Sequence, residues 1–198
     1  MTDYLIELDK SALLFINSHN NAFFDNFFYI VSDKYVWIPL YIALLIAVWF
    51  KSGKSIKQTL TFVVFIALLI LCADQTCTSI FKNNVQRLRP CHDGTISNMV
   101  HLVNNYCGGK YGFISSHAAN FFALAGFTSL YFKNRYYTSI AFFLAILTCY
   151  SRIYLGVHFP GDIICGAWAG FTWSLIIYIL FDKFMKKKFK ENYIYGRF

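Results

Sequence analysis

Charged side chains are scarce in this sequence of 198 residues. Asp, Glu, Lys and Arg make up only 14% of it and hydrophobic residues 57%, whereas about a quarter of the residues in a soluble domain are charged. The composition excludes an ordinary soluble domain and predicts a membrane protein. The net charge of +8 does not indicate nucleic-acid binding, because the basic residues lie between and after the apolar stretches. We expect the lipid bilayer as a partner and no nucleic acid.

The sequence also lacks the segments that divide or process a chain. It has no Pro-, Ser- or Gly-rich linker, no internal repeat and no low-complexity tract, and its length suits one domain. The first ten residues, MTDYLIELDK, include acids and lack the basic region and the small-residue cleavage site of a signal peptide. We therefore expect a single membrane-embedded domain over residues 1–198, inserted by its own helices.

Five apolar segments approach the roughly 20 residues that an α-helix needs to cross a bilayer. An open sheet edge cannot face lipid, and no segment alternates in the manner of a barrel strand. The sequence thus predicts an all-α polytopic membrane bundle of about five transmembrane helices. The expected helices cover residues 35–50, 59–81, 116–132, 136–152 and 161–181.

Residues 1–32 mix apolar and polar side chains. They suit two short interfacial helices, and a sixth span is the alternative. A full crossing would bury several polar side chains at a considerable free-energy cost, so we favour interfacial helices on the outer side. The polar side chains are Asp9, Asn17, His19, Asn20, Asn21 and Asp25.

Basic residues predict the orientation of the bundle. With antiparallel neighbouring helices, three basic groups fall on one side of the membrane, which the positive-inside rule makes cytoplasmic. This places residues 183–198 in a basic cytoplasmic tail and residues 82–115 in a long outer loop. The three groups are Lys51, Lys54 and Lys57; Lys133 and Arg135; and Lys183, Lys186, Lys187, Lys188 and Lys190.

Three polar clusters fall on the outer side, and their cations indicate a bound anion because the positive-inside rule disfavours them there. Arg89 and Arg152 can bind a phosphate bidentately, while Lys82 supplies a point charge. Ser115, Ser116 and the adjacent backbone N–H groups lie at a helix start, where anions bind readily. The clusters are KNNVQRLRP with Lys82, Arg89 and Pro90; ISSHAAN with Ser115, Ser116 and His117; and SRIYLGVHFPGD with Arg152, His158 and Asp162.

The two histidines and the acid are the groups that a phosphatase needs. His158 precedes a helix that we expect to start at residue 160 or 161, so Asp162 would lie in its first turn. A hydrogen bond from one imidazole nitrogen to Asp162 would fix the tautomer and leave the other nitrogen as a nucleophile. His117, at the outer start of another helix, suits a general acid that protonates the leaving oxygen and later activates water.

Each of these residues also has a structural interpretation. A single histidine near a helix end is more often a hydrogen-bonded structural residue, and arginines at membrane interfaces often reach toward headgroups. Ser115 can be a helix N-cap, and Asp162 can complement the helix dipole. These interpretations do not explain why both histidines and the strongest anion binders occur at one membrane face, so we favour catalysis.

Cys91 and Cys107 differ from the other four cysteines, which lie in expected helices and behave as small apolar residues. Both belong to the outer loop, where a disulfide can form and would stabilise the loop by roughly 3 kcal/mol in the chain-entropy model. Two unpaired thiols are the alternative. The sequence CHD at 91–93 lacks the paired spacing of a zinc motif, so we expect no metal.

The three clusters resemble the signature of the type 2 phosphatidic acid phosphatase superfamily, which reads K-x6-R-P, P-S-G-H and S-R-x5-H-x3-D. The first and third clusters match at every specified position. In the second, Ile114 and Ser116 replace proline and glycine, and a side chain at Ser116 would narrow the phosphate cradle or add a hydroxyl contact. The matching residues are Lys82, Arg89, Pro90, Ser115, His117, Ser151, Arg152, His158 and Asp162.

The resemblance implies a metal-independent lipid phosphatase that uses no cofactor. It implies a phosphohistidine on His158, oriented by Asp162, with His117 as the acid. Small integral membrane members similar to this chain are bacterial lipid phosphatases, so undecaprenyl diphosphate is the leading substrate; lipid A, phosphatidylglycerol phosphate and phosphatidic acid are alternatives. The site would lie on the outer face of the bacterial cytoplasmic membrane. The phosphoryl oxygens would be held by Lys82, Arg89, Ser115, Ser116 and Arg152.

Two rival functions would use the same residues. Vanadium-dependent haloperoxidases hold vanadate with similar side chains, but they are larger and soluble. A lipid or anion transporter would use the outer cations as a binding vestibule, yet internal repeats or helices broken near mid-membrane would then be expected. Neither is apparent in this sequence, so a phosphatase is the favoured function.

Overall fold

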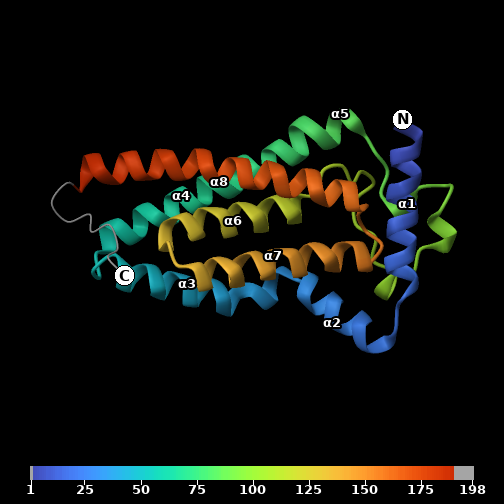
Figure 1. Cartoon of the computed structure of the whole chain (residues 1–198), viewed down its shortest axis with the longest axis horizontal. Helices are drawn as coiled ribbons and strands as arrows, with labels where there is room; N and C mark the ends of the chain where they lie inside the picture. Colours follow the sequence, from blue (N-terminus) through green and yellow to red (C-terminus); the bar gives the residue numbers. More distant parts are fainter. Residues whose placement is uncertain (1, 190–198) are drawn as a thin grey trace.

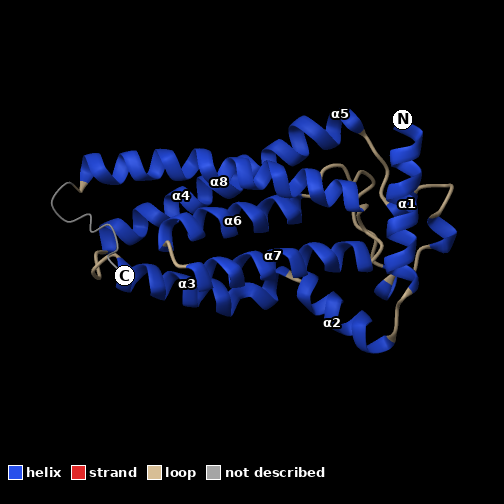
Figure 2. Cartoon of the chain, in the orientation of Figure 1, coloured by secondary structure: helices blue, strands red, loops and turns tan. Residues whose placement is uncertain are grey.

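The computed structural model describes residues 2–189, and Figure 2 shows them as helices joined by loops. Within that range the β-pairing is limited to an isolated antiparallel bridge between Leu88 and Tyr111. The expectation of an all-α helical bundle is confirmed.

The helices follow one another along the chain with short turns, except for the long connection between α5 and α6. A 3-10 turn (Lys34–Trp37) leads into α3, and a π-helical segment (Thr76–Lys82) continues α4 into α5. The bounds are α1 (Thr2–Ser18), α2 (Ala22–Ser32), α3 (Ile38–Lys51), α4 (Ile56–Gln75), α5 (Asn83–Val85), α6 (Ser116–Phe132), α7 (Arg135–Tyr154) and α8 (Pro160–Lys188).

Side-chain caps determine where several helices begin. Asn21 caps α2, Ser55 caps α4 and Asn134 caps α7, each by accepting a hydrogen bond from a backbone N–H two or three residues later. These caps satisfy N–H groups that a helix leaves unpaired in its first turn. The chain can therefore reverse direction over a few residues.

The expected helix at 116–132 coincides with α6, and the other starts agree within a few residues. The expected helix at 161–181 is too short, because α8 continues to Lys188, into the expected basic tail at 183–198. Lysines in a last turn interact favourably with the helix dipole, and Lys186 also pairs with Asp182 at 2.6 Å. Residues 190–198 of that tail lie outside the described residues.

Three helical stretches among residues 2–189 are long and apolar enough to cross a membrane, namely 34–51, 56–85 and 160–188. In Figure 1, α6 and α7 run alongside them. α6 has 17 residues and packs against α4, α7 and α8. Its small side chains are therefore covered largely by protein.

Aromatic rings fill the core between α4, α6 and α8. Phe62 of α4 packs edge-on against Phe127 of α6 with 5.5 Å between ring centroids, and both rings contact Phe181 of α8. All three side chains are buried. This cluster lies toward the end where α4 begins and α8 ends, so it holds the long helices together far from the outer loop.

Near their other ends, α6 and α8 approach each other closely through small residues. A Cβ atom on Gly170 would overlap the carbonyl oxygen of Ala119, and one on Gly166 would crowd the carbonyl oxygen of Ser115. Small residues four positions apart allow membrane helices to pack at short distance. This contact places the start of α6 against the start of α8.

α1 lies across one end of the bundle, beside the outer loop, and does not run parallel to the long helices (Figure 1). Leu13 on α1 is fully buried. The side-chain amide of Asn17 donates to the carbonyl oxygens of His101 at 2.9 Å and Tyr154 at 2.7 Å. α1 is thus tied to both the outer loop and the end of α7.

We expect Gly170→Val to destabilise the protein, because the added side chain would overlap the backbone of α6 at Ala119. Overpacking of this kind costs about 1–3 kcal/mol, which thermal unfolding in detergent micelles measures as a lower midpoint. Cys165→Val introduces the same side chain at an exposed position of α8 and serves as the control. Equal midpoints for the two variants would contradict the close packing of α6 and α8.

Candidate active site

The three polar clusters meet at the end of the bundle where α1 lies. Figure 1 shows the α5–α6 and α7–α8 connections at this end, whereas the α3–α4 turn, the α6–α7 turn and the end of α8 lie at the opposite end. The basic groups at 51–57 and 133–135 and the lysines at 183–188 belong to that opposite end. The predicted site residues and the predicted cytoplasmic lysines therefore lie at opposite ends of the molecule.

His158 lies in the loop between α7 and α8 and is only 1% exposed. Its Nε2 is 3.1 Å from Nη1 of Arg89, and its Nδ1 is 3.3 Å from Oδ2 of Asp162. A guanidinium can only donate hydrogen bonds, so Nε2 accepts and Nδ1 carries the proton. Gly112 packs closely against the ring, since a Cβ atom there would lie 3.6 Å from Nδ1. In this tautomer the lone pair of Nε2 accepts the hydrogen bond from Arg89.

Burial and neighbouring cations hold the pKa of His158 well below its usual value. Burial disfavours the charged imidazolium, and Arg89, Arg152 and Lys82 repel it. The imidazole is therefore neutral at a pH where a free histidine is half protonated. A nucleophile in this state needs no prior deprotonation.

Asp162 lies in the first turn of α8, and its side chain is completely buried. Its Oδ2 accepts the backbone N–H of Phe159 at 3.1 Å, which caps the helix, and its Oδ1 accepts from Nη1 of Arg87 at 3.0 Å. The carboxylate is held on both oxygens and faces the His158 ring. Its orientation is therefore set by the backbone and by a second residue.

Lys82, Arg89 and Arg152 place three mutually repelling cations around His158. The buried Nε–H groups of Arg89 and Arg152 have no hydrogen-bond partner among residues 2–189. An unpaired buried donor costs about 1–3 kcal/mol, and a phosphate oxygen would remove that cost. Burial also lowers the pKa of Arg89. The cluster suits a dianion bound next to Nε2 of His158.

Two serines hold the cations in place. The ammonium of Lys82 donates to Oγ of Ser116 at 2.8 Å, and Arg152 donates to Oγ of Ser32. Ser116 replaces glycine in the ISSH cluster, and its hydroxyl therefore adds a contact to Lys82. Ser32, at the end of α2, was not among the residues that sequence reasoning selected.

Ser115 is the N-cap of α6, because its Oγ accepts the backbone N–H of Ala118 at 3.4 Å. Its own N–H donates to the carbonyl oxygen of Asp162 at 3.0 Å. Ser115 is thus a structural N-cap, as one interpretation of the sequence expected. Its backbone hydrogen bond to Asp162 links the starts of α6 and α8. Contact of Ser115 with a phosphate remains a prediction.

His117 lies in the first turn of α6 and interacts electrostatically with Arg152, His158, Arg89 and Lys82. It lines two neighbouring cavities. One, of about 380 Å³, has both polar and apolar walls and is bordered by Tyr29, Ser32, Asp33, Lys34, Tyr106, His117, Arg152 and Leu155. The other, of about 500 Å³, is mainly apolar and is bordered by Lys34, Tyr41, Leu44, Leu45, Phe62, Val63, Ile66, Ile70, His117, Asn120, Phe121 and Leu124.

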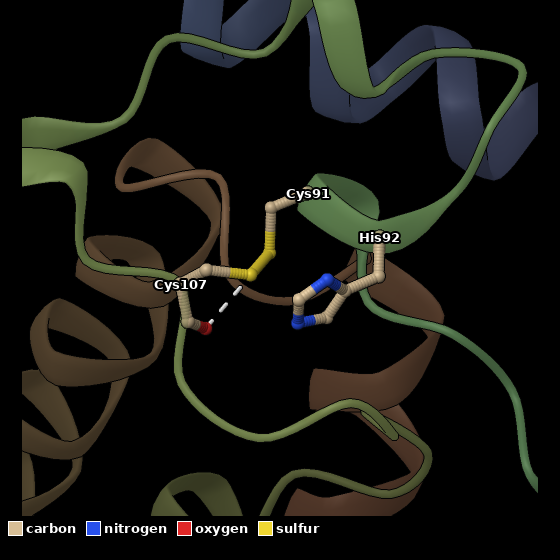
Figure 3. Close-up of side chains that lie close together, drawn as sticks. All are labelled: Cys91, His92 and Cys107. Atoms are coloured by element: carbon tan, nitrogen blue, oxygen red, sulfur yellow. Dashed lines mark hydrogen bonds between the residues drawn. A yellow bond between two sulfur atoms is a disulfide. The ribbon is translucent and has the colours of Figure 1, made fainter.

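A disulfide joins Cys91 to Cys107 with their Cα atoms 6.1 Å apart, and Figure 3 shows the imidazole of His92 beside it. The bridge holds this part of the outer loop close to the site. Gly108, next to Cys107, approaches Arg89 so closely that a Cβ atom there would lie 3.5 Å from the guanidinium carbon. The ligand atoms of the two cysteines and His92 lie within 4.8 Å of one another. Sulfurs joined in a disulfide are not thiolates, and a thiolate is the form that ligates metal.

Sequence reasoning missed the part that two polar residues, Arg87 and Asp9, play in the site. Nη2 of Arg87 donates to Oδ2 of Asp9 at 2.6 Å, and Asp9 belongs to α1. The sequence signals were weak: Arg87 lies two residues before Arg89 in the first cluster, and Asp9 interrupts an apolar segment.

The family model of the PAP2 superfamily matches residues 63–186, which include all three polar clusters. A lipid A 4'-phosphatase of Porphyromonas gingivalis is 39% identical over 176 residues, covering 89% of this chain and 74% of the relative. One of Bacteroides thetaiotaomicron is 34% identical over 198 residues, covering 100% and 87%. An undecaprenyl-diphosphatase of Sulfolobus acidocaldarius is 30% identical over 140 residues, covering 71% and 60%.

Solved structures have the same fold. The crystal structure of Aquifex aeolicus LpxE matches with a TM-score of 0.61 at 25% identity, covering 84% of this chain and 92% of the other. A transmembrane PAP2-type phosphatidylglycerolphosphate phosphatase from Bacillus subtilis matches with a TM-score of 0.63 at 19% identity, covering 93% and 88%. The second likeness shows the fold alone.

The chain therefore belongs to the PAP2 superfamily, as the three sequence clusters predicted. It is an integral membrane protein with several spans. Within that superfamily it is a lipid phosphatase, a hydrolase that acts on phosphoric ester bonds.

We expect the imidazole of His158 to remain neutral from pH 7.5 to pH 5.5, because its folded pKa lies well below the usual value of about 6.5. The side-chain ¹⁵N signals, measured by NMR on the ¹⁵N-histidine protein in micelles and assigned with His158→Ala, should not move over this range. A titration of the His158 signals with a midpoint near that usual value would contradict the assigned electrostatics.

Proposed function

We propose that this protein hydrolyses a phosphate monoester of lipid A through a phosphohistidine on His158. The two lipid A 4'-phosphatases share more identity with the chain, and more of their length, than the undecaprenyl-diphosphatase does. These relations favour lipid A, which the sequence alone left as an alternative, over undecaprenyl diphosphate, which it ranked first.

One observation carries the proposal: the cavity with polar and apolar walls and the mainly apolar cavity share Lys34 and His117, which line both. The apolar cavity has α3, α4 and α6 as its walls. A lipid with a phosphorylated polar head and acyl chains fits this arrangement, with its phosphate near His117 and its chains between the helices. Ligand sites of this kind combine apolar walls with a few placed polar groups.

In the first chemical step, Nε2 of His158 attacks phosphorus and forms an N–P bond. The bond from phosphorus to the ester oxygen breaks, and His117, protonated once the bound phosphate dianion has offset the surrounding cations, gives its proton to that oxygen. Asp162 accepts the hydrogen bond from Nδ1 and stabilises the positive charge that develops on the ring. The lipid alcohol leaves and the phosphoryl group stays on His158.

In the second step, water attacks the phosphorus of the phosphohistidine. His117, now neutral, takes a proton from the water, the N–P bond breaks, and its electron pair returns to Nε2 of His158. Inorganic phosphate leaves and both histidines regain their starting states. Neither step requires a metal ion.

The cations supply the electrostatic part of catalysis. Charge on the phosphoryl oxygens is stabilised by groups that are already in place before the reaction. Lys82, Arg89 and Arg152 would bind these oxygens, and Ser116 would orient Lys82 through the hydrogen bond that it already accepts. Ser115 caps the start of α6, where the backbone N–H groups of Ser116 and His117 would donate to these oxygens.

We also propose that the site lies on the outer face of the bacterial cytoplasmic membrane, with α3, α4, α6, α7 and α8 as five spans of a single domain. α7 has 20 residues, close to the roughly 20 that a crossing needs, and α6 is shorter but covered by its neighbours. α1 and α2 would rest at the outer interface, where the exposed Leu5 and Phe15 of α1 and Phe23 of α2 can enter the headgroup region.

A panel of lipid phosphates in mixed micelles tests the substrate. We expect kcat/KM for 4'-phosphorylated lipid A to exceed that for undecaprenyl diphosphate, phosphatidylglycerol phosphate and phosphatidic acid by about tenfold or more, since paired polar headgroup contacts discriminate strongly. Phosphate release in excess chelator should match that without it, and His158→Ala should release none. A higher kcat/KM for undecaprenyl diphosphate would refute lipid A as the substrate. If the folded wild-type protein released phosphate from none of the lipids, the phosphatase activity itself would be refuted.

A further inference from the structure

The carboxylate of Asp162 is connected to α1 by two consecutive ion pairs. Nη1 of Arg87 donates to Oδ1 of Asp162 at 3.0 Å, and Nη2 of the same guanidinium donates to Oδ2 of Asp9 at 2.6 Å. Arg87 follows α5, Asp9 belongs to α1, and Asp162 lies in the first turn of α8. Three segments far apart in the sequence thus meet behind the catalytic imidazole.

Asp9 also contacts the start of α8 directly. Its Oδ1 accepts the backbone N–H of Gly161 at 2.7 Å, one of the N–H groups that a helix leaves unpaired in its first turn. A Cβ atom on Gly161 would lie 2.8 Å from Oδ2 of Asp9, so a larger residue here would displace the carboxylate. Asp9 therefore acts on the same helical turn that carries Asp162.

Arg87 is confined on a third side by an aromatic ring. Its guanidinium carbon lies 4.1 Å from the ring centroid of Phe159, a favourable cation–π arrangement. Phe159 is also the residue whose backbone N–H donates to Oδ2 of Asp162. The planar guanidinium is thus held between Phe159, Asp9 and Asp162, with little freedom to turn away.

These charges are largely removed from water. The side chains of Arg87, Asp9 and Asp162 are 24%, 14% and 0% exposed. A buried carboxylate is stable in its ionised form only when it is paired and hydrogen-bonded. Arg87 occupies one oxygen of Asp162, which leaves the other for Phe159 N–H and for Nδ1–H of His158.

We propose that Arg87 and Asp9 are positioning residues of the active site. Arg87 keeps Asp162 ionised and turned toward His158, and Asp9 keeps Arg87 in place. α1 thereby completes the site from outside the motif-bearing part of the chain. The inference rests on the proposed role of His158 as the nucleophile.

Turnover of single variants of the full-length protein gives the first test. Arg87→Gln should lower kcat about 10–100-fold with KM unchanged, the range seen when the outer partner of a functional histidine is lost. Asp9→Asn, which keeps the shape but loses the charge, should lower kcat by less, and Arg87→Lys should restore part of the loss. Thermal unfolding midpoints show that each variant is folded at the assay temperature.

Lys10→Gln is the matched control. Lys10 follows Asp9 on α1 and donates to Oγ1 of Thr95 at 2.9 Å in the outer loop, with Asp93 3.7 Å away. Its substitution disturbs the docking of α1 on the loop without altering the ion pairs to Asp162. We expect kcat within about twofold of wild type, as for an independent position.

A double variant separates positioning from general destabilisation. If Arg87 acts through Asp162, Arg87→Gln combined with Asp162→Asn should turn over as slowly as Asp162→Asn alone, within about twofold. A residue with an independent structural role would multiply the two losses. Multiplied losses would overturn the proposal.

The NMR signal of the proton on Nδ1 of His158 provides a readout that needs no turnover. It should shift in Arg87→Gln and in Asp9→Asn and stay in place in Lys10→Gln. If the signal shifts while wild type hydrolyses no lipid, the phosphatase proposal fails and the positioning role stands. If wild type is active and neither kcat nor the signal changes in the two variants, the positioning role is refuted.

Discussion

The hydrogen bond between His158 and Asp162 is the interaction on which the active site depends. It is local, since Pro160 starts α8 directly after the loop and places Asp162 in its first turn. It assigns the proton to Nδ1, so the lone pair of Nε2 faces Arg89. Without it, the cation cluster could still bind a phosphate, but the imidazole would not be fixed in the tautomer that attacks.

The remainder of the fold keeps three cations close to a neutral imidazole. Like charges in a buried site repel, so the structure has to hold them by hydrogen bonds and by packing. Ser116 holds Lys82, Ser32 holds Arg152, and the close contact of α6 with α8 brings the two helix starts together. An anionic substrate relieves the repulsion, so the strain in the free site favours phosphate binding.

Whether the sequence predicts a contact of the site depends on how far apart its two residues lie in the chain. His158 and Asp162 are four residues apart, so motif spacing alone places them together. Helix α6 was predicted residue for residue because its apolar segment has a polar start and a basic end. Arg87 and Asp9 are 78 residues apart, and Ser32 and Arg152 are 120 apart, so only the packed helices bring them together. The two cavities that Lys34 and His117 both line likewise form only when the helices pack.

The central claim, that Nε2 of His158 carries the phosphoryl group, is tested most directly by trapping the enzyme during turnover of a ³²P-labelled lipid phosphate. Quenching in alkali preserves phosphohistidine, and peptide mass spectrometry then locates the label. The account predicts a single acid-labile phosphate on His158 of the wild-type protein. Label on any other residue, or turnover with no labelled protein at any time before steady state, would contradict it.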